Sequence, residues 1–375
     1  MTNSRQIFLT LLKVALGWRE SCSIPENVNW NEIVSIAEEQ GVLPIIIDGY
    51  EKYLIDNPQC TSFLSKKQNE ELKVRVLSSV YSYENTYIQH LGALSVLSAI
   101  LDGKGIPFIV MKGLSCGRYY PIPKHRPCGD IDIFAGTNYT SSNKALEENG
   151  ISVIPHYYRH SVSTIYGVTI ENHRILSDLR GPQKQTKELE ELLVKLGEQS
   201  LVDGESYDKE LSAAHYPTAD FNAIFLPWHV SAHFEFERVT IRHLLDWALF
   251  LKTDGRKINL EMYREAKRKF SFGYGPFADI LTDLSIRYLG LSKQSLPIEI
   301  IEDAEHVDKE LADKVFERIF DVTEPASDTN VWRERWKLFK YIWKDGWKYK
   351  GLYGMSPIRF LFYKIYGVVF KVGEE

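Results

Sequence analysis

Apolar positions in residues 1–103 recur at helical spacing. One stripe fits the first 15 residues, and a second begins near Trp30 with an asparagine as a possible N-cap. From Lys66 to Leu101 the apolar residues lie near one face of a long helix, which Asp102-Gly103 would end. These patterns predict an N-terminal helical bundle over residues 1–103.

The pattern changes in residues 104–182, where apolar runs become short and rich in β-branched residues. We expect a strand at 106–111, a short helix at 113–120, a strand at 130–135, a helix at 141–149, and further strands at 151–157, 161–166 and 168–175. A strand-helix-strand unit followed by hairpin-like strands predicts a small mixed sheet with helices on one face.

Helical periodicity returns in residues 183–330. Helices are expected at 187–196, 223–234 and 241–251, with two between 260 and 291 and an amphipathic stretch at 297–320. The remaining residues, 331–375, are predicted to form a basic, aromatic-rich helical tail. The predicted fold class is therefore α+β, with a small sheet domain between N- and C-terminal helical domains.

Composition excludes only a few classes of protein and of site. Hydrophobic residues make up 44% and charged residues 25% of the 375 residues, as in ordinary globular proteins, and the net charge of −5 gives no overall argument for nucleic-acid binding. The four cysteines contain no CxxC pair, which argues against a zinc knuckle and favours reduced thiols in the cytoplasm. Neither a signal peptide nor a membrane-spanning helix is expected.

The strongest chemical signal is the segment Gly129-Asp-Ile-Asp-Ile133. Because side chains alternate along a strand, Asp130 and Asp132 point to one face while the two isoleucines point to the other. A glycine turn at Lys112-Gly113 follows the preceding strand. Paired carboxylates beside a glycine turn suit a divalent metal ion that holds a phosphate.

A third acid lies on the strand predicted at 168–175, where Glu171 and His173 share a face. Carboxylates on neighbouring strands would hold Mg²⁺ or Mn²⁺ together with phosphate oxygens. Gly113 would let backbone amides approach a phosphate, and Lys112 and Arg126 would supply positive charge. His173 is either a group that supports the metal ligands or a surface histidine.

Taken together, Gly113 after a strand, the Gly-Asp-Ile-Asp segment and a later acid resemble the nucleotidyltransferase superfamily typified by DNA polymerase beta. The longer string, with Lys112-Gly113, Tyr119-Tyr-Pro121 and Arg126, is similar to a bacterial branch of uncharacterised nucleotidyltransferases. The resemblance spans roughly residues 5–255, and its most specific part is residues 111–134.

This resemblance implies that Asp130 and Asp132 bind metal, with Glu171 as third carboxylate and Gly113 as phosphate-loop glycine. The superfamily's usual glycine-serine pair is altered here, since Ser115 stands one place late, and Lys112 is a candidate replacement for its phosphate contact. The implied reaction moves a nucleoside monophosphate from an NTP to an acceptor hydroxyl and releases pyrophosphate.

These residues identify neither the acceptor nor whether the protein is catalytically active. A sugar, another small molecule, a protein or an RNA all remain open as acceptors. The alternative is a catalytically degenerate nucleotidyltransferase fold that binds a nucleotide or a partner.

Two features on the C-terminal helices have several interpretations. His229 and His233 stand at i and i+4, a spacing that zinc can use, but they also fit a buried core helix or a base or acceptor pocket. Asp246 would cap its helix or pair with Arg242 or His243. Arg126 would either contact phosphate or pair with Asp130.

The tail alternates aromatic and basic residues over 331–370. It contains Trp332, Trp336, Trp343 and Trp347 together with Lys337, Lys340, Lys344, Lys348 and Lys350. The tryptophan spacing is helical, so either the indoles pack on the body while the lysines face water, or the tail contacts a membrane surface or nucleic acid.

Overall fold

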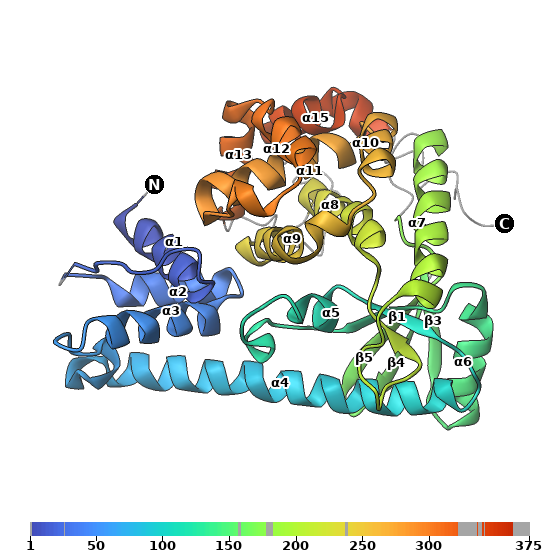
Figure 1. Cartoon of the computed structure of the whole chain (residues 1–375), viewed down its shortest axis with the longest axis horizontal. Helices are drawn as coiled ribbons and strands as arrows, with labels where there is room; N and C mark the ends of the chain where they lie inside the picture. The colour runs from blue at the N-terminus through green and yellow to red at the C-terminus, as the bar shows by residue number, and fades with distance from the viewer. Residues whose placement is uncertain are drawn as a thin grey trace.

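The structure is a computed structural model that describes residues 2–25, 27–156, 159–177, 183–236, 239–321, 336, 340 and 342–362. Within these residues, helices surround one mixed sheet of six strands (Figure 1). The predicted α+β class is confirmed.

The N-terminal part is helical, as predicted. Its helices are α1 (Asn3–Ala15), α2 (Trp30–Glu39), α3 (Leu43–Asp56) and α4 (Glu70–Asp102), with short 3₁₀ turns at Phe63–Ser65 and Lys67–Asn69. Thr2 and Asn29 cap α1 and α2 by accepting hydrogen bonds from backbone N–H groups in the first turn. The long α4 runs beneath both the other N-terminal helices and the sheet (Figure 1).

The sheet has the order β3-β4-β5-β2-β1-β6. Its strands are β1 (Phe108–Met111), β2 (Ile131–Phe134), β3 (Val153–His156), β4 (His160–Ile165), β5 (Val168–His173) and β6 (Ala214–His215). β2 lies between antiparallel β1 and parallel β5, so the two acid-bearing strands are direct neighbours. The sequence did not predict β6, which pairs with β1 in parallel from beyond residue 182.

Short helices connect these strands. They are α5 (Gly113–Gly117), the 3₁₀ turns Pro123–His125 and Gly136–Asn138, and α6 (Tyr139–Glu148). α5 ends three residues earlier than expected, and a turn toward the following prolines replaces its last part. A second hydrophobic core, formed by Leu94, Leu97, Val110, Ile131, Ile133 and Leu146 among others, joins the sheet to α4 and α6.

The C-terminal part is helical as well. Its helices are α7 (Gln183–Asp203), α8 (Ala219–Phe236), α9 (Ile241–Asp254), α10 (Leu260–Lys269), α11 (Tyr274–Leu284), α12 (Ile298–Glu305), α13 (Lys309–Ile319) and α15 (Gly346–Tyr353), with short turns at Gly255–Lys257, Ser285–Leu289 and Lys293–Ser295. The stretch expected at 297–320 is divided because Asp308 caps a new helix, α13.

The N- and C-terminal helices share one hydrophobic core rather than packing separately. Phe8 and Phe320 meet edge to face with ring centroids 6.0 Å apart. The buried Gln40 side chain donates to the Ile319 carbonyl and accepts from the Ile241 N–H, so it joins α2 to both α13 and α9. The position of α9 is therefore fixed partly from the N-terminal helices.

Part of the tail packs on the body, while Trp332, Lys337 and other parts of it lie outside the described residues. On α15, Lys348 Nζ donates to the Phe234 carbonyl, and the Tyr353 hydroxyl donates to the Ser231 carbonyl. Lys348 is fully buried, so the expectation that the tail's lysines face water is wrong at this position. No helix in the described ranges is long and apolar enough to cross a membrane.

Candidate functional site

The turn after β1 has an unusual backbone. Lys112 has φ of +49° and Gly113 has φ of +22°, both outside the common regions for L-residues. A Cβ at Gly113 would lie 2.7 Å from Cys128 Sγ and 3.3 Å from the Asp130 carbonyl oxygen. Cys128 Sγ donates to that same carbonyl over 2.9 Å. Glycine is needed here both for its backbone freedom and for the close approach of the chain that leads into β2.

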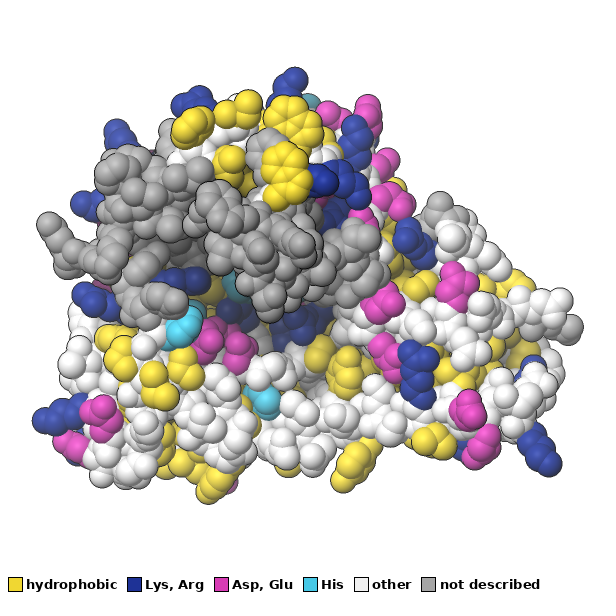
Figure 2. All heavy atoms as spheres, turned by 180° about the vertical axis from the view of Figure 1, so that it is seen from behind, with side chains coloured by type: hydrophobic (Ala, Val, Ile, Leu, Met, Phe, Trp, Pro, Cys, Tyr) yellow, Lys and Arg dark blue, Asp and Glu magenta, His cyan; other side chains and the backbone are white. Residues whose placement is uncertain are grey.

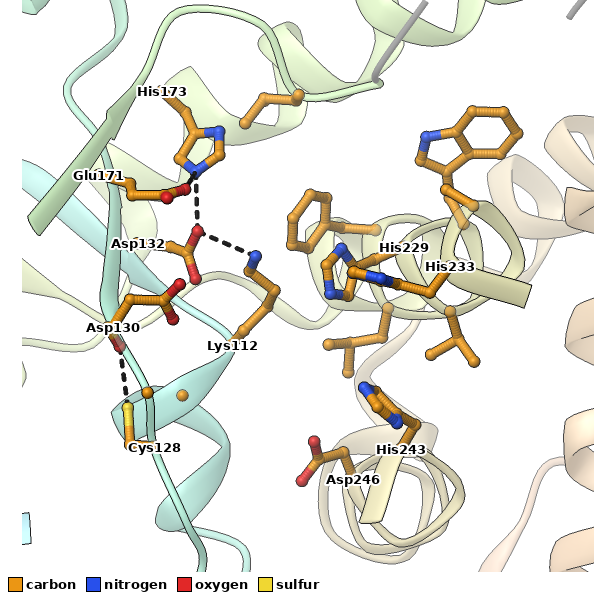
Figure 3. A pocket seen from close by; sticks show the side chains of 18 of the residues that line it. Lys112, Cys128, Asp130, Asp132, Glu171, His173, His229, His233, His243 and Asp246 are labelled. Atoms are coloured by element: carbon orange, nitrogen blue, oxygen red, sulfur yellow. Dashed lines mark hydrogen bonds and ion pairs between the residues drawn. The ribbon is translucent and has the colours of Figure 1, made fainter. Parts of the chain in front are cut away.

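Strand register brings the predicted acids together. Asp132 on β2 lies opposite Met111 on β1 and beside Glu171 on β5. One oxygen from each of Asp130, Asp132 and Glu171 can be chosen so that all three lie within 4.8 Å of one another. Figure 3 shows the three carboxylates facing the same space. Their predicted role as metal ligands is thus geometrically possible.

Positive groups contact only part of this acid cluster. Lys112 Nζ lies 2.9 Å and His173 Nε2 lies 2.7 Å from the same Asp132 oxygen. Burial alone would raise the pKa of Asp132, but these two groups outweigh it and lower that pKa. His173 is buried, so it is not the surface histidine that one interpretation allowed.

Asp130 is in a different position. Burial and the nearby Asp132 carboxylate raise its pKa, and no hydrogen-bond or ion-pair partner of its side chain occurs among the described residues. Glu171 has its pKa lowered, chiefly by the contact with His173. The site therefore combines a carboxylate that lacks a partner with two that are ionised, which fits a divalent cation with oxygen ligands.

The structure places the other three side chains that were predicted to bind phosphate in three different environments. Lys112 lines the pocket and points toward Asp132 (Figure 3). Arg126 also lines it, but its guanidinium donates to Asp246 from Nε at 2.9 Å and from Nη2 at 2.7 Å. Ser115 is buried in α5 and is not part of the pocket lining. The structure thus rules out Asp130 as the Arg126 partner.

Two carboxylates on α9 hold the segment that precedes β2. Asp246 accepts from the Tyr120 hydroxyl at 2.7 Å in addition to Arg126. Asp254, two turns later, accepts from the Tyr119 hydroxyl and from Arg118, each at 2.9 Å. The expectation that Asp246 pairs with its helical neighbours is wrong, because its partners Tyr120 and Arg126 come from the segment between α5 and β2.

A cavity of about 400 Å³ lies between the acids and the helices α8 and α9. On one face of the molecule, acidic, basic and histidine side chains gather at a hollow (Figure 2). The far wall carries Phe225, Trp228, His229, His233 and His243. This wall gives the site the mixture of apolar surface and a few polar groups that is typical of small-molecule pockets.

His229 and His233 line this wall with their ring centroids 4.3 Å apart. Burial lowers the pKa of His229 and of His243 well below the usual value, so both are neutral at pH 7. Among the described residues, two groups of side chains have metal-binding geometry, and neither contains His229 or His233. The zinc interpretation of this pair therefore has no support, and a pocket role remains a prediction.

A family model described as uncharacterised nucleotidyltransferase matches residues 26–272. The chain belongs to this family. No curated protein and no solved structure matches it. The matched range contains the Gly113 turn, all three carboxylates and the helices α8 and α9, so the whole pocket belongs to the part that defines the family.

Arg242 is a pocket residue that the sequence did not single out as a candidate. It lines the pocket on α9, and neither a hydrogen bond nor an ion pair of its side chain occurs within the described residues. Burial, followed by the charge of Arg126, lowers the pKa of Arg242. The sequence suggested a pairing with Asp246 four residues on, and nothing in it showed that Arg126 takes that carboxylate.

His160 of the nucleotidyltransferase was also missed. It begins β4, one residue before the predicted strand, and lies buried beside Glu171. Burial lowers its pKa to about 4. The predicted strand began at residue 161. Had it begun at residue 160, the alternation of side chains along a strand would have shown which face of the sheet His160 occupies.

Proposed function

We propose that this protein is a metal-dependent nucleotidyltransferase of the polymerase beta type, which moves a nucleoside monophosphate from an NTP to an acceptor hydroxyl. The observation that carries the proposal is the group formed by Asp130, Asp132 and Glu171, whose oxygens lie within 4.8 Å beside the Gly113 turn. Family membership supports the transferase class, and the carboxylates add the metal-dependent chemistry.

The three carboxylates would hold Mg²⁺ or Mn²⁺. When bound, such an ion neutralises charge on the triphosphate and helps to activate the attacking hydroxyl. The donor set fits because hard oxygen ligands suit these ions and because Asp130 has a raised pKa and no partner among the described residues. Burial and then repulsion by Asp132 raise this pKa, and a cation between the acids would offset both.

Groups at the Gly113 turn and on α9 would contact the phosphates from two sides of the pocket. The Gly113 turn admits phosphate oxygens close to the backbone, and Lys112 already directs its ammonium group into the pocket. From α9, the guanidinium of Arg242, whose Nε has no hydrogen-bond partner among the described residues, would contact the triphosphate by charge-assisted hydrogen bonds. We assign these contacts to Lys112, Gly113 and Arg242 because Arg126 is held by Asp246 and Ser115 lies outside the pocket lining.

The reaction forms one bond and breaks one. The acceptor oxygen bonds to the α-phosphorus as the bond from that phosphorus to the β-phosphate oxygen breaks, and pyrophosphate leaves with the electron pair. Glu171, whose pKa is lowered, is ionised at neutral pH and would take the proton from the acceptor hydroxyl. The acceptor would lie against the wall of α8 and α9, where His229, His233 and Trp228 line the pocket.

Pyrophosphate release from each NTP, measured with Mg²⁺ or Mn²⁺ and candidate acceptors, tests the proposal. Asp130→Asn and Asp132→Asn should abolish turnover, whereas Asp56→Asn at an exposed position should leave it unchanged. Calorimetry with the NTP and metal should be run beside it. Nucleotide binding without any pyrophosphate release would reject catalysis in favour of a nucleotide-binding protein with a degenerate site.

A further inference from the structure

A second set of metal-type ligands lies next to the carboxylates, and the sheet itself places them there. His160 on β4 lies directly opposite His173 on β5, and Glu171 lies two residues earlier on the same strand as His173. Residues opposite each other or two apart on a strand share one face of the sheet. Glu171 is also beside Asp132 on β2, so the row of side chains crosses three adjacent strands.

The distances between the side chains of His160, Glu171 and His173 would allow one bound ion to contact all three. His160 Nε2 lies 3.6 Å from Glu171 Oε1, and His173 Nε2 lies 3.4 Å from Glu171 Oε2. One donor atom from each of His160, Glu171 and His173 can be chosen so that all lie within 4.8 Å of one another. The two imidazole rings are held with their centroids 5.1 Å apart.

His160 supplies an independent sign of a missing partner. Its side chain is only 8% exposed, yet its Nδ1 is buried with no hydrogen-bond partner within the described part of the chain. Its Nε2 is directed at Glu171 from 3.6 Å, which is too far for a hydrogen bond. A ligand between His160 Nε2 and Glu171 would give this nitrogen a partner that no described residue provides at hydrogen-bond distance.

We propose that His160, Glu171 and His173 form a second metal position that takes a transition-metal ion such as Mn²⁺ or Zn²⁺ in preference to Mg²⁺. Imidazole nitrogen suits these ions, whereas Mg²⁺ prefers oxygen ligands alone. The inference rests on the proposed function in one respect, since Glu171 would bridge this position and the position formed with Asp130 and Asp132. Two metal ions that share a carboxylate in this way lie about 3.5–4 Å apart in other phosphoryl-transfer sites.

Metal binding would replace the contact between His173 and Asp132 by a bond between His173 and the ion. Without metal its Nε2 lies 2.7 Å from Asp132 Oδ1. With metal, the same nitrogen would bind the ion, and Asp132 would contact the cation instead of the imidazole. A purely supporting role for His173, in which it only orients Asp132, predicts no bond between nitrogen and metal, so spectroscopy separates the two.

The test loads the full chain with Mn²⁺ alone and records pulsed EPR for coupling between the electron spin and imidazole ¹⁴N. We expect ¹⁴N coupling in the native protein, and replacement of its histidines by [¹⁵N]histidine should remove the ¹⁴N pattern without any mutation. His160→Gln and His173→Gln should each reduce the coupling and weaken Mn²⁺ binding by at least about tenfold. His229→Gln, which changes an imidazole on the opposite wall, should keep both.

The outcomes separate this inference from the proposed function. Bound Mn²⁺ without ¹⁴N coupling would overturn the nitrogen-ligated position while leaving the carboxylate site in place. No binding of Mn²⁺ at all would overturn both. Nitrogen coupling in a protein that turns over no NTP would support the metal position and reject catalysis.

Discussion

The Asp246 carboxylate on α9 accepts two hydrogen bonds from Arg126, which lies 120 residues earlier, four positions before Asp130. Both side chains are almost fully buried, at 6% and 9% exposure. The pair holds the segment leading into β2 against the C-terminal helices. The acids therefore depend for their position on a helix far away in the sequence.

Asp246→Asn should strongly destabilise the protein, because it leaves the Arg126 guanidinium buried without its counter-ion. Breaking a buried pair from one side typically costs about 3–5 kcal/mol. The free energy of unfolding from denaturant titration measures this cost. Asp313→Asn, which breaks an exposed pair with Arg287, should cost under about 1 kcal/mol. Equal losses in the two variants would contradict the role given to Asp246.

Gly113→Ala should destabilise the turn by about 1–3 kcal/mol, the usual range for a strained backbone position. Its new methyl group would approach Cys128 Sγ closely, at 2.7 Å. Cys128→Ala in the same chain should restore part of the loss, since it removes the atom in closest contact, and thermal unfolding measures both steps.

Gly129→Ala is the matched control for this turn, since a Cβ there meets nothing within 4 Å. It should shift the unfolding temperature far less than Gly113→Ala. A double variant that is no more stable than Gly113→Ala alone would show that contact with Cys128 is not the cause.

Arg242→Gln should have opposite effects on stability and on binding. Removal of a half-buried guanidinium whose Nε has no hydrogen-bond partner among the described residues should leave the free energy of unfolding unchanged or raise it. Loss of a charge-assisted contact should weaken NTP binding about tenfold or more. Calorimetry with an NTP and Ca²⁺ measures the affinity, and Arg256→Gln, an exposed change outside the pocket, is the control. Unaltered NTP affinity would remove Arg242 from the triphosphate site.

His125 should make stability depend on pH. Its Nδ1 lies 2.8 Å from Asp48 and its Nε2 lies 3.0 Å from Glu84, so it joins α3 to α4. Burial alone would lower the pKa of His125, but the two carboxylates raise it above 6.5. The stabilisation is therefore fully present below the unfolded pKa and is lost as pH rises through the higher folded pKa.

His125→Gln should accordingly cost most at pH 5.5 and progressively less toward pH 8.5. Urea unfolding of both proteins across this range gives the difference in free energy at each pH. A cost that stays constant with pH would mean that His125 acts through its shape and not through its charge.

Sequence patterns predicted the local parts of this fold well. Alternation along the predicted strand 130–135 placed Asp130 and Asp132 on one face, and alternation along 168–175 placed Glu171 beside His173; β2 and β5 proved to be neighbours. Such predictions succeed because the period of a strand is a local property that the sequence carries directly. That the acids lie on neighbouring strands was part of the metal-site hypothesis and does not follow from strand periodicity.

Long-range partners were not predictable in the same way. Asp246 was expected to pair within its own helix, but Arg126 and Tyr120 reach it from another part of the fold. Nothing in spacing or composition distinguishes these options, because the choice depends on how α9 packs. Within the described residues, that same packing leaves Arg242 Nε without a hydrogen-bond partner. The predicted strand also began one residue after β4 does, so His160 was not recognised as a strand residue.

The two-residue strand β6 has a consequence for any attempt to isolate the sheet. It covers the outer edge of β1, where the Phe108 N–H donates to the Ala213 carbonyl, and every residue of β1 is buried. A fragment that ends at residue 182 would leave this apolar edge open to other chains. Such a fragment should self-associate by edge-to-edge pairing, whereas one that extends beyond residue 215 carries its own protection.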